Sequence, residues 1–162
     1  MNSKKIKINK GFSLVEIVIG ASIISLFLFA SVPLFQSYLK AGSQNTKIIQ
    51  ASFLLEEGIE AVKMLRDNGW QNNITTLDTG TEYHLYFNGV SWETSNSSNQ
   101  IDGVFRRTVT LSDVYRDNSD NIAESGTIDS DTQKVDVSVS WLGNRGTTTK
   151  TLSTYITNIF DN

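Results

Sequence analysis

Apolar and polar residues follow three different patterns along the chain. Residues 11–39 form an almost unbroken apolar run in which Glu16 is the only charged side chain. Beyond Lys40 apolar residues recur every three or four positions, which predicts one face of an amphipathic helix. The residues on this face are Ile48, Ala51, Leu55, Ile59, Val62 and Leu65. After Trp70 the period falls to two, which predicts strands.

The two helical patterns together predict a single helix from Phe12 to about Asp67. Asp67-Asn68-Gly69 is a helix-stop signal, because asparagine and glycine readily adopt the left-handed backbone conformation. A continuous helix of these 56 residues would be about 84 Å long. Gly42 and Gly58 weaken the prediction of continuity, since glycine costs about 1 kcal/mol relative to alanine inside a helix. Pro33 lacks an amide hydrogen and is expected to kink or loosen the helix.

Four strands are predicted in the region 69–162. The clearest runs from Val135 to Trp141, where apolar and polar residues alternate. A turn at Gly143-Asn144-Arg145-Gly146 joins it to a threonine-rich strand over 148–159, which predicts a hairpin. The other two strands are expected at 83–87, with an extension towards Trp92, and at 105–115. These elements predict an α+β fold, a long N-terminal α-helix packed on a small antiparallel β-sheet of about four strands.

Composition limits the chemistry available to the chain. Its 162 residues are enough for one small globular domain and exclude a large multidomain enzyme. The absence of cysteine excludes disulfides, thiolate metal sites and a cysteine nucleophile, and His84 is the single histidine. No cofactor is expected.

Charge is distributed unevenly. Residues 1–11 contain four lysines and no acid, whereas the remaining residues contain ten basic and 17 acidic side chains, a net charge of −7. The leader lysines are Lys4, Lys5, Lys7 and Lys10. An acidic body repels polyanions, so general nucleic-acid binding is disfavoured.

The apolar run is long enough to cross a bilayer, which takes about 20 residues as a helix. The positive-inside tendency then places the lysine-rich flank in the cytoplasm and the C-terminal part outside. A secretory signal or a plain anchor has the same general form. Two details argue against these alternatives. Leu28 and Ala30 fit a signal cleavage site poorly, and an unpaired carboxylate at Glu16 costs about 2.5–3.5 kcal/mol in the span.

The stretch Lys10-Gly11-Phe12-Ser13-Leu14-Val15-Glu16-Ile17 resembles the processing site of type IV prepilins and pseudopilins. The match consists of several features found together: a short basic leader, Gly11 before Phe12, and a glutamate at the fifth position counted from Phe12. An apolar run follows, with Pro33 placed 21 residues after Phe12. The resemblance implies that a prepilin peptidase removes residues 1–11 by cutting after Gly11 and that Phe12 is then N-methylated.

The resemblance also implies a fold, partners and a location. Residues 12–40 would be the transmembrane and assembly helix, 41–68 its amphipathic half, and 69–162 the β-domain of a ladle-like pilin. The chain would start as a single-pass cytoplasmic membrane protein with its C-terminal domain outside. Other pilin subunits, an inner-membrane platform and an assembly ATPase would then place it in an extracellular filament, without enzymatic activity.

Processing changes the electrostatics of the N-terminus. Cutting after Gly11 removes all four leader lysines and exposes an α-amine, whose ordinary pKa of about 7.7–8.0 makes it cationic. In an apolar bundle this amine on Phe12 and the carboxylate of Glu16 on a neighbouring subunit can neutralise each other. The pairing would favour one axial stagger, with Glu16 and Pro33 as assembly residues.

The β domain holds several weaker candidates. His84 lies in a predicted strand with no second histidine, nucleophile elbow or metal-ligand spacing, which favours a structural role. The acidic segment Asp117–Asp131 is conceivable as a calcium site, but it lacks EF-hand spacing and a solvated loop is favoured. Arg106-Arg107 is the only adjacent arginine pair and is expected to be salt-bridged or solvated.

The three tryptophans are candidates for core packing or for adhesion. Trp70 stands at the helix end and Trp141 on the apolar face of a strand, so both are expected in the core. Trp92 lies beside a polar run and is the best candidate for contact with a surface or a sugar. Binding of DNA or a surface glycan has no other support in the sequence.

Three functional classes remain open at this stage. The favoured one is a minor pilin. Two segments resemble some minor subunits: Glu56-Glu57-Gly58-Ile59-Glu60-Ala61-Val62 and the cysteine-free strand Val135–Trp141. A pseudopilin of a type II secretion system is a related possibility, because it would assemble by the same filament physics. The second is a pilus-displayed adhesin or DNA-uptake module. The third is a membrane-tethered hydrolase built around His84.

Overall fold

The computed structural model describes residues 11–143 and 146–160. The leader lysines Lys4, Lys5, Lys7 and Lys10, and Asn144 and Arg145 of the predicted turn, lie outside the described residues. The chain separates into two units, residues 1–43 and 44–162. Each unit is described by itself.

The first unit is helical. Helix α1 (Leu14–Asp67) begins in this unit and continues through Pro33 without a break in its secondary structure. Large apolar side chains lie on every side of it, and those from Phe12 to Leu39 are more than half exposed. The expected bending or melting at Pro33 during assembly stays a prediction.

The second unit begins with the amphipathic part of α1, which ends at Asp67 as the helix-stop signal predicts. Its buried residues are Ala51, Leu55, Gly58, Ile59, Ala61, Val62 and Leu65. Ile48, placed on the same face by the sequence, is 39% exposed. The short helix α2 (Trp70–Asn73) follows and buries Trp70.

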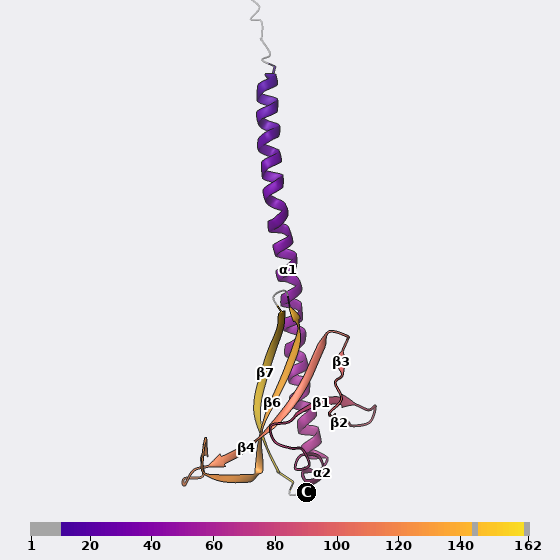
Figure 1. The fold of residues 1–162 in the computed structure, drawn as a ribbon, viewed down its shortest axis with the longest axis vertical. Coiled ribbons are helices and arrows are strands. Elements are labelled where there is room, and N and C mark those ends of the chain that lie inside the picture. The colour runs from indigo at the N-terminus through magenta and orange to yellow at the C-terminus, as the bar shows by residue number, and fades with distance from the viewer. Residues whose placement is uncertain (1–10, 144–145, 161–162) are drawn as a thin grey trace, which may run out of the picture. The chain divides into compact units, whose positions relative to one another are not determined.

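An antiparallel sheet packs on the buried face of this part of α1 (Figure 1). Its main path has the order β2-β1-β4-β6-β7, and two short strands, β3 and β5, pair with β4. The strands are β1 (Glu82–Phe87), β2 (Trp92–Ser95), β3 (Gln100–Ile101), β4 (Phe105–Arg116), β5 (Ile122–Ala123), β6 (Thr127–Gly143) and β7 (Gly146–Thr157). The α+β class is therefore confirmed.

The predicted count of about four strands is wrong, because the described residues form a seven-stranded sheet. The four long strands β1, β4, β6 and β7 correspond to the predicted ones, but β2, β3 and β5 have only two to four residues and were not expected. The extension of the first strand to Trp92 is also wrong. Strand β1 ends at Phe87, and Trp92 starts β2, which pairs back on β1 with Phe87 opposite Trp92.

The core lies between the second half of α1 and the long strands. Val135, Val137 and Val139 on β6 are fully buried, and Trp141 is 2% exposed. Phe105 on β4 packs its ring against Trp141 with a centroid distance of 5.9 Å. The alternation that predicts the β6 strand therefore also predicts the face that meets the helix.

Candidate functional site

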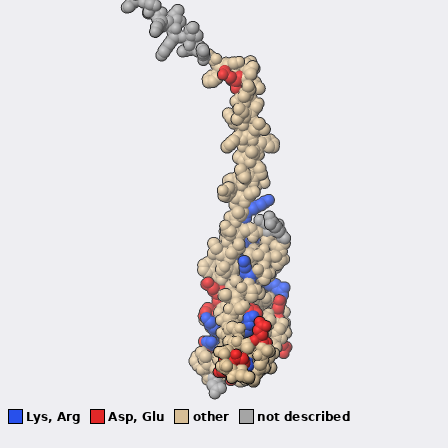
Figure 2. Space-filling view, turned by 90° about the vertical axis from the view of Figure 1, so that its left-hand side faces the viewer, with Lys and Arg blue, Asp and Glu red and all other residues tan. Residues whose placement is uncertain are grey.

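The apolar segment, residues 12–39, is the largest exposed apolar surface in the described part of the chain. Phe12, Phe29 and Tyr38 are each more than three-quarters exposed, and apolar side chains cover the full circumference of the helix. A helix that is apolar all round requires lipid or other helices as its surroundings. By length and composition α1 can cross a membrane. Figure 2 shows most of this segment free of charged side chains.

Three serines within the apolar segment hydrogen-bond to the helix backbone. The Ser22 hydroxyl donates to the carbonyl of Val18 (2.7 Å), and the Ser25 hydroxyl donates to Ala21 (2.8 Å). Ser31 donates to Leu28 at 2.8 Å. A hydroxyl without a partner is costly in a lipid environment, and these bonds remove that cost inside the helix itself.

Glu16 caps the N-terminus of α1. The helix begins at Leu14, and the backbone N–H of Ser13 donates to Glu16 Oε2 at 3.0 Å, while the Ile17 N–H donates to the Ser13 carbonyl at 3.2 Å. Ser13 at the N-cap and a glutamate three residues later form one half of a capping box. The carboxylate also stands at the positive end of the helix dipole. Glu16 thus has a partner within its own chain.

The predicted processing residues lie just outside the helix. Gly11, Phe12 and Ser13 have no helical structure, and Phe12 is 85% exposed. The Gly11–Phe12 peptide bond therefore precedes the N-cap in accessible, non-helical backbone. The structure brings Gly11, Phe12 and Glu16 to one end of the helix, whereas Pro33 lies about five helical turns further on.

The capping role of Glu16 was missed by the sequence analysis. The pattern that signals it, Ser13-x-x-Glu16 before an apolar run, is present in the chain. This pattern overlaps the motif that resembles prepilins. Glu16 can therefore be interpreted both as a helix cap and as the assembly residue of a pilin. The two interpretations are compatible, because only one of its two carboxylate oxygens accepts the Ser13 N–H.

His84 is buried in the described fold. It lies on β1, is 3% exposed, and its Nδ1 donates to the carbonyl of Arg107 at 3.1 Å. The carbonyl can only accept, so this bond fixes the proton on Nδ1. Its surroundings are those of a satisfied core histidine.

Arg106 and Arg107 point to opposite faces of the sheet, as adjacent strand residues do. Arg106 is half-exposed and lies 3.4 Å from Glu82. Arg107 is 3% exposed, and its Nη1 donates to Glu57 Oε2 (2.8 Å) and to the Leu54 carbonyl (3.3 Å) on α1. The expectation that the pair is salt-bridged is confirmed, and the divergence of the two side chains removes the geometry of a nucleic-acid patch.

Trp92 is part of the packing around Arg107. Its ring is half-buried against the core and lies 5.1 Å from the Arg107 guanidinium carbon. The Phe87 ring is 5.6 Å away on the neighbouring strand. The Arg107 cation lies over the Trp92 ring and occupies a face that a sugar would use. Trp70 and Trp141 are 1% and 2% exposed, so their predicted place in the core is confirmed.

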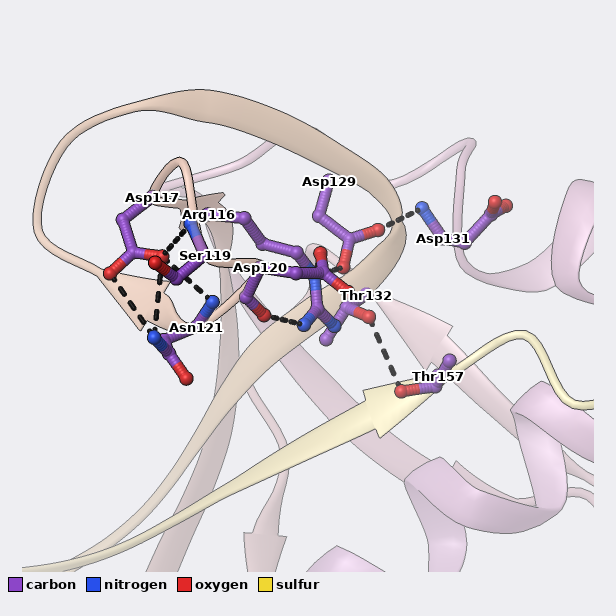
Figure 3. A network of polar contacts seen from close by, with 9 residues as sticks. All are labelled: Arg116, Asp117, Ser119, Asp120, Asn121, Asp129, Asp131, Thr132 and Thr157. Carbon is purple, nitrogen blue, oxygen red and sulfur yellow. Dashed lines mark hydrogen bonds and ion pairs between the residues drawn. The ribbon is translucent and has the colours of Figure 1, made fainter.

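The acidic segment forms a turn organised by its own hydrogen bonds, which Figure 3 shows in detail. We call residues 116–131 the acidic lobe. Asp117 Oδ1 accepts the backbone N–H groups of Ser119 (2.8 Å) and Asn121 (2.9 Å). Arg116 Nε donates to Asp129 Oδ2 at 2.6 Å, and Arg116 Nη1 donates to the Asp120 carbonyl at 2.8 Å.

These contacts perturb the ionisation of the lobe. Hydrogen bonds from Asn121 and Ser119 lower the pKa of Asp117. Burial is the largest single effect on Asp129 and opposes its ionisation, but hydrogen bonds from Arg116, Thr132 and the Asp131 amide outweigh it and lower the pKa of Asp129. Gly126 closes the lobe with φ +149°, and a Cβ there would lie 2.1 Å from the Arg116 carbonyl oxygen.

A metal site is not formed by the described residues. No three histidine, aspartate or glutamate side chains in residues 11–143 and 146–160 converge as metal ligands would. In the acidic lobe, Asp117 and Asp129 direct oxygens to backbone amides and to Arg116 instead. The calcium alternative therefore finds no ligand cluster in this segment.

Comparison with known proteins adds no assignment, because no protein-family model, no curated protein and no solved structure matches the chain.

Proposed function

We propose that this chain is a structural subunit of a type IV pilus or a related filament, and specifically a minor pilin. One observation carries the proposal: Glu16, the only charged residue of the apolar segment, lies within about one turn of the accessible Gly11–Phe12 bond. An exposed apolar helix needs lipid before assembly and other helices after it. A filament supplies the second environment.

The proposed steps follow from the charges at this end of the chain. Cleavage after Gly11 by a prepilin peptidase leaves Ser13 and Glu16 in place, so the cap survives the cut. The carboxylate oxygen of Glu16 that does not accept the Ser13 N–H then meets the cationic amine of Phe12 on a neighbouring subunit. Because each charge alone is costly in an apolar bundle, only the stagger that joins them is favoured.

The remaining parts of the proposal rest on the resemblance of the N-terminal segment. An inner-membrane platform and an assembly ATPase would move the subunit from the membrane into the filament. The β-domain would be carried outside the cell in a ladle-like pilin fold, without catalytic activity. A pseudopilin of a type II secretion system would use the same helix chemistry and differ in the machine it serves.

Mass spectrometry of the N-terminus of the protein from its own cells tests the proposal. We expect a chain that starts at Phe12 and carries one methyl group on its α-amine. An intact Met1, or a start near Ala30, would instead identify a simple anchor or a secreted domain. A Gly11→Leu variant is the control, because a side chain at the cleavage position should leave the leader attached.

A further inference from the structure

A groove of about 550 Å³ opens at one end of the second unit. Lys47 of α1 and Arg106 of β4 line it, together with the polar side chains of Gln100, Ser140 and Thr147. Val104, in the turn between β3 and β4, forms part of its wall and is 41% exposed. We call this the basic groove, since two cations and no carboxylate are among the described residues that line it.

The strand register explains why these residues meet. Gln100 pairs with Arg106, and Arg106 pairs with Ser140 on β6. Leu142, two residues further along β6, pairs with Thr147 of β7. Residues opposite one another share a face of the sheet, so the polar side chains form adjacent rows at the end of the strands. Lys47 reaches the same end by donating from Nζ to the Leu142 carbonyl at 3.1 Å.

Both cations keep donors available for a further acceptor. Lys47 uses one of its three ammonium hydrogens for Leu142. The ion pair of Arg106 with Glu82 is long, at 3.4 Å, and both side chains are about half exposed. Such surface pairs contribute little and exchange readily.

The acidic lobe lies at the opposite end of the same strands (Figure 1). Phe105 and Trp141 pair at the groove end of β4 and β6, whereas Arg116 and Thr127 pair at the lobe end. The lobe contains five carboxylates and one cation, Arg116. The carboxylates of Glu124 and Asp131 are exposed and contact no cation in the described residues.

A single chain cannot bring these two surfaces together. The 12 residues of β4 separate them by about 37 Å at about 3.4 Å per residue. Two copies stacked along the strand direction can, since the lobe of one then faces the groove of the next. A contact between different surfaces of identical subunits repeats from copy to copy, and it generates a fibre when the rotation between copies does not close into a ring.

We propose that the basic groove binds the acidic lobe of a second copy of this chain, so that the β-domains contact one another head to tail. The attraction is electrostatic: Lys47 and Arg106 receive the carboxylates of Glu124 and Asp131. This inference rests on the proposed function, because a filament is what would align the copies for such a contact. It adds an interface between β-domains to the one formed by the apolar segment.

Disulfide trapping in the full chain tests this contact, because the chain has no cysteine of its own. Val104→Cys in the groove wall and Ser125→Cys, at an exposed serine of the lobe, are combined in one protein, which is expressed in its own cells and oxidised. We expect a ladder of dimers, trimers and longer species on a non-reducing gel. Each single variant should stop at the dimer or remain monomeric.

Charge reversal shows whether the ladder depends on the proposed attraction. Adding Lys47→Glu and Arg106→Glu to the double-cysteine protein should reduce the ladder at least fivefold, and Glu124→Lys with Asp131→Lys should restore it. Lys150→Glu, at an exposed cation of β7 outside the groove, is the matched control and should leave the ladder unchanged. A ladder that ignores the groove charges would overturn the proposal.

A second cysteine probe separates this contact from the filament itself. Ser25→Cys in the apolar segment reports on contacts between helices. Helix crosslinks without a domain ladder would refute the head-to-tail contact while leaving the filament function intact. A domain ladder without helix crosslinks would support the contact and refute assembly through the helix. Crosslinks only to other proteins would assign the groove to a different partner and overturn the proposal.

Discussion

Gly58 lets α1 approach the sheet more closely than any residue with a side chain would. A Cβ atom at this position would lie 2.6 Å from Val137 Cγ1 and 3.1 Å from Arg107 Cδ. Both neighbours are held in the core, since Val137 is fully buried and Arg107 is tied to Glu57. The glycine that weakens the helix in isolation is therefore the one that allows the helix to pack.

We expect Gly58→Ala to lower the melting temperature of the full chain in detergent. Overpacking of a core site costs about 1–3 kcal/mol, which exceeds the roughly 1 kcal/mol that alanine gains in a helix. Gly42→Ala is the matched control, because nothing lies within 4 Å of its Cβ position. It should leave the melting temperature unchanged or raise it. Equal effects of the two substitutions would contradict the packing argument.

Two substitutions of Glu16 separate its cap from its charge. Glutamine keeps an oxygen that can accept the Ser13 N–H but loses the charge, and alanine loses both. If the proposed pairing with the Phe12 amine controls assembly, both variants should enter the membrane normally and appear at least tenfold less in sheared filaments. Immunoblots of membrane and filament fractions measure this. Normal incorporation of Glu16→Gln would assign Glu16 a capping role alone.

The acidic lobe illustrates how a turn between two strands can be specified by charge and hydrogen bonding. Lowered pKa values of Asp117 and Asp129 mean that the folded lobe favours their ionised forms. A carboxyl group with a lowered pKa contributes its full stabilisation of the folded state above the ordinary aspartate pKa of about 3.9. This stabilisation is lost as the pH falls below that value and through the lower pKa of the folded state.

We therefore expect the lobe to be intact at pH 5 and to loosen as the pH falls below about 4. The amide resonances of Ser119 and Asn121 can be followed by NMR on the full chain in detergent as the pH is lowered. Their chemical shifts should change with a midpoint pH below the ordinary aspartate pKa. Asp117→Asn should remove most of this titration. A midpoint at or above that value would show that these hydrogen bonds do not favour the carboxylate.

The elements that the sequence predicts are those with a long periodic pattern. The end of α1 at Asp67 and the four long strands carry such patterns, whereas β2, β3 and β5 are too short to show any alternation. The start of β6 was missed because residues 127–131 are exposed or only half-buried, so no apolar period marks them. Short strands depend on their neighbours for pairing, and the neighbours are known only from the fold.

The candidate site was predictable only in part for a similar reason. Glu16 is conspicuous as a lone acid, and its cap has a local sequence signal, so both can be found without a structure. Arg107 is different, because its burial depends on contact with Glu57, which is 50 residues away in sequence. The doublet Arg106-Arg107 looks like one basic feature until the strand directs its two side chains to opposite faces.

At the scale of the whole molecule, the apolar segment should decide where the chain resides. Leu28→Lys places a charge in the middle of the apolar helix, at a cost of about 2.5–3.5 kcal/mol for membrane insertion. We expect less of this variant to resist extraction of membranes by alkaline carbonate. Ser43→Lys, beyond the apolar segment, is the control. Equal retention of both variants would contradict a membrane-spanning role.

Strands β6 and β7 pair over 12 successive residues in an unshifted register, in a chain without cysteine. Backbone pairing and packing thus secure the last strand of the sheet without a covalent link. Folding of this domain therefore requires no thiol-oxidising enzyme. Its yield should be the same in anaerobic and aerated cultures, and it should withstand reducing agents in its surroundings.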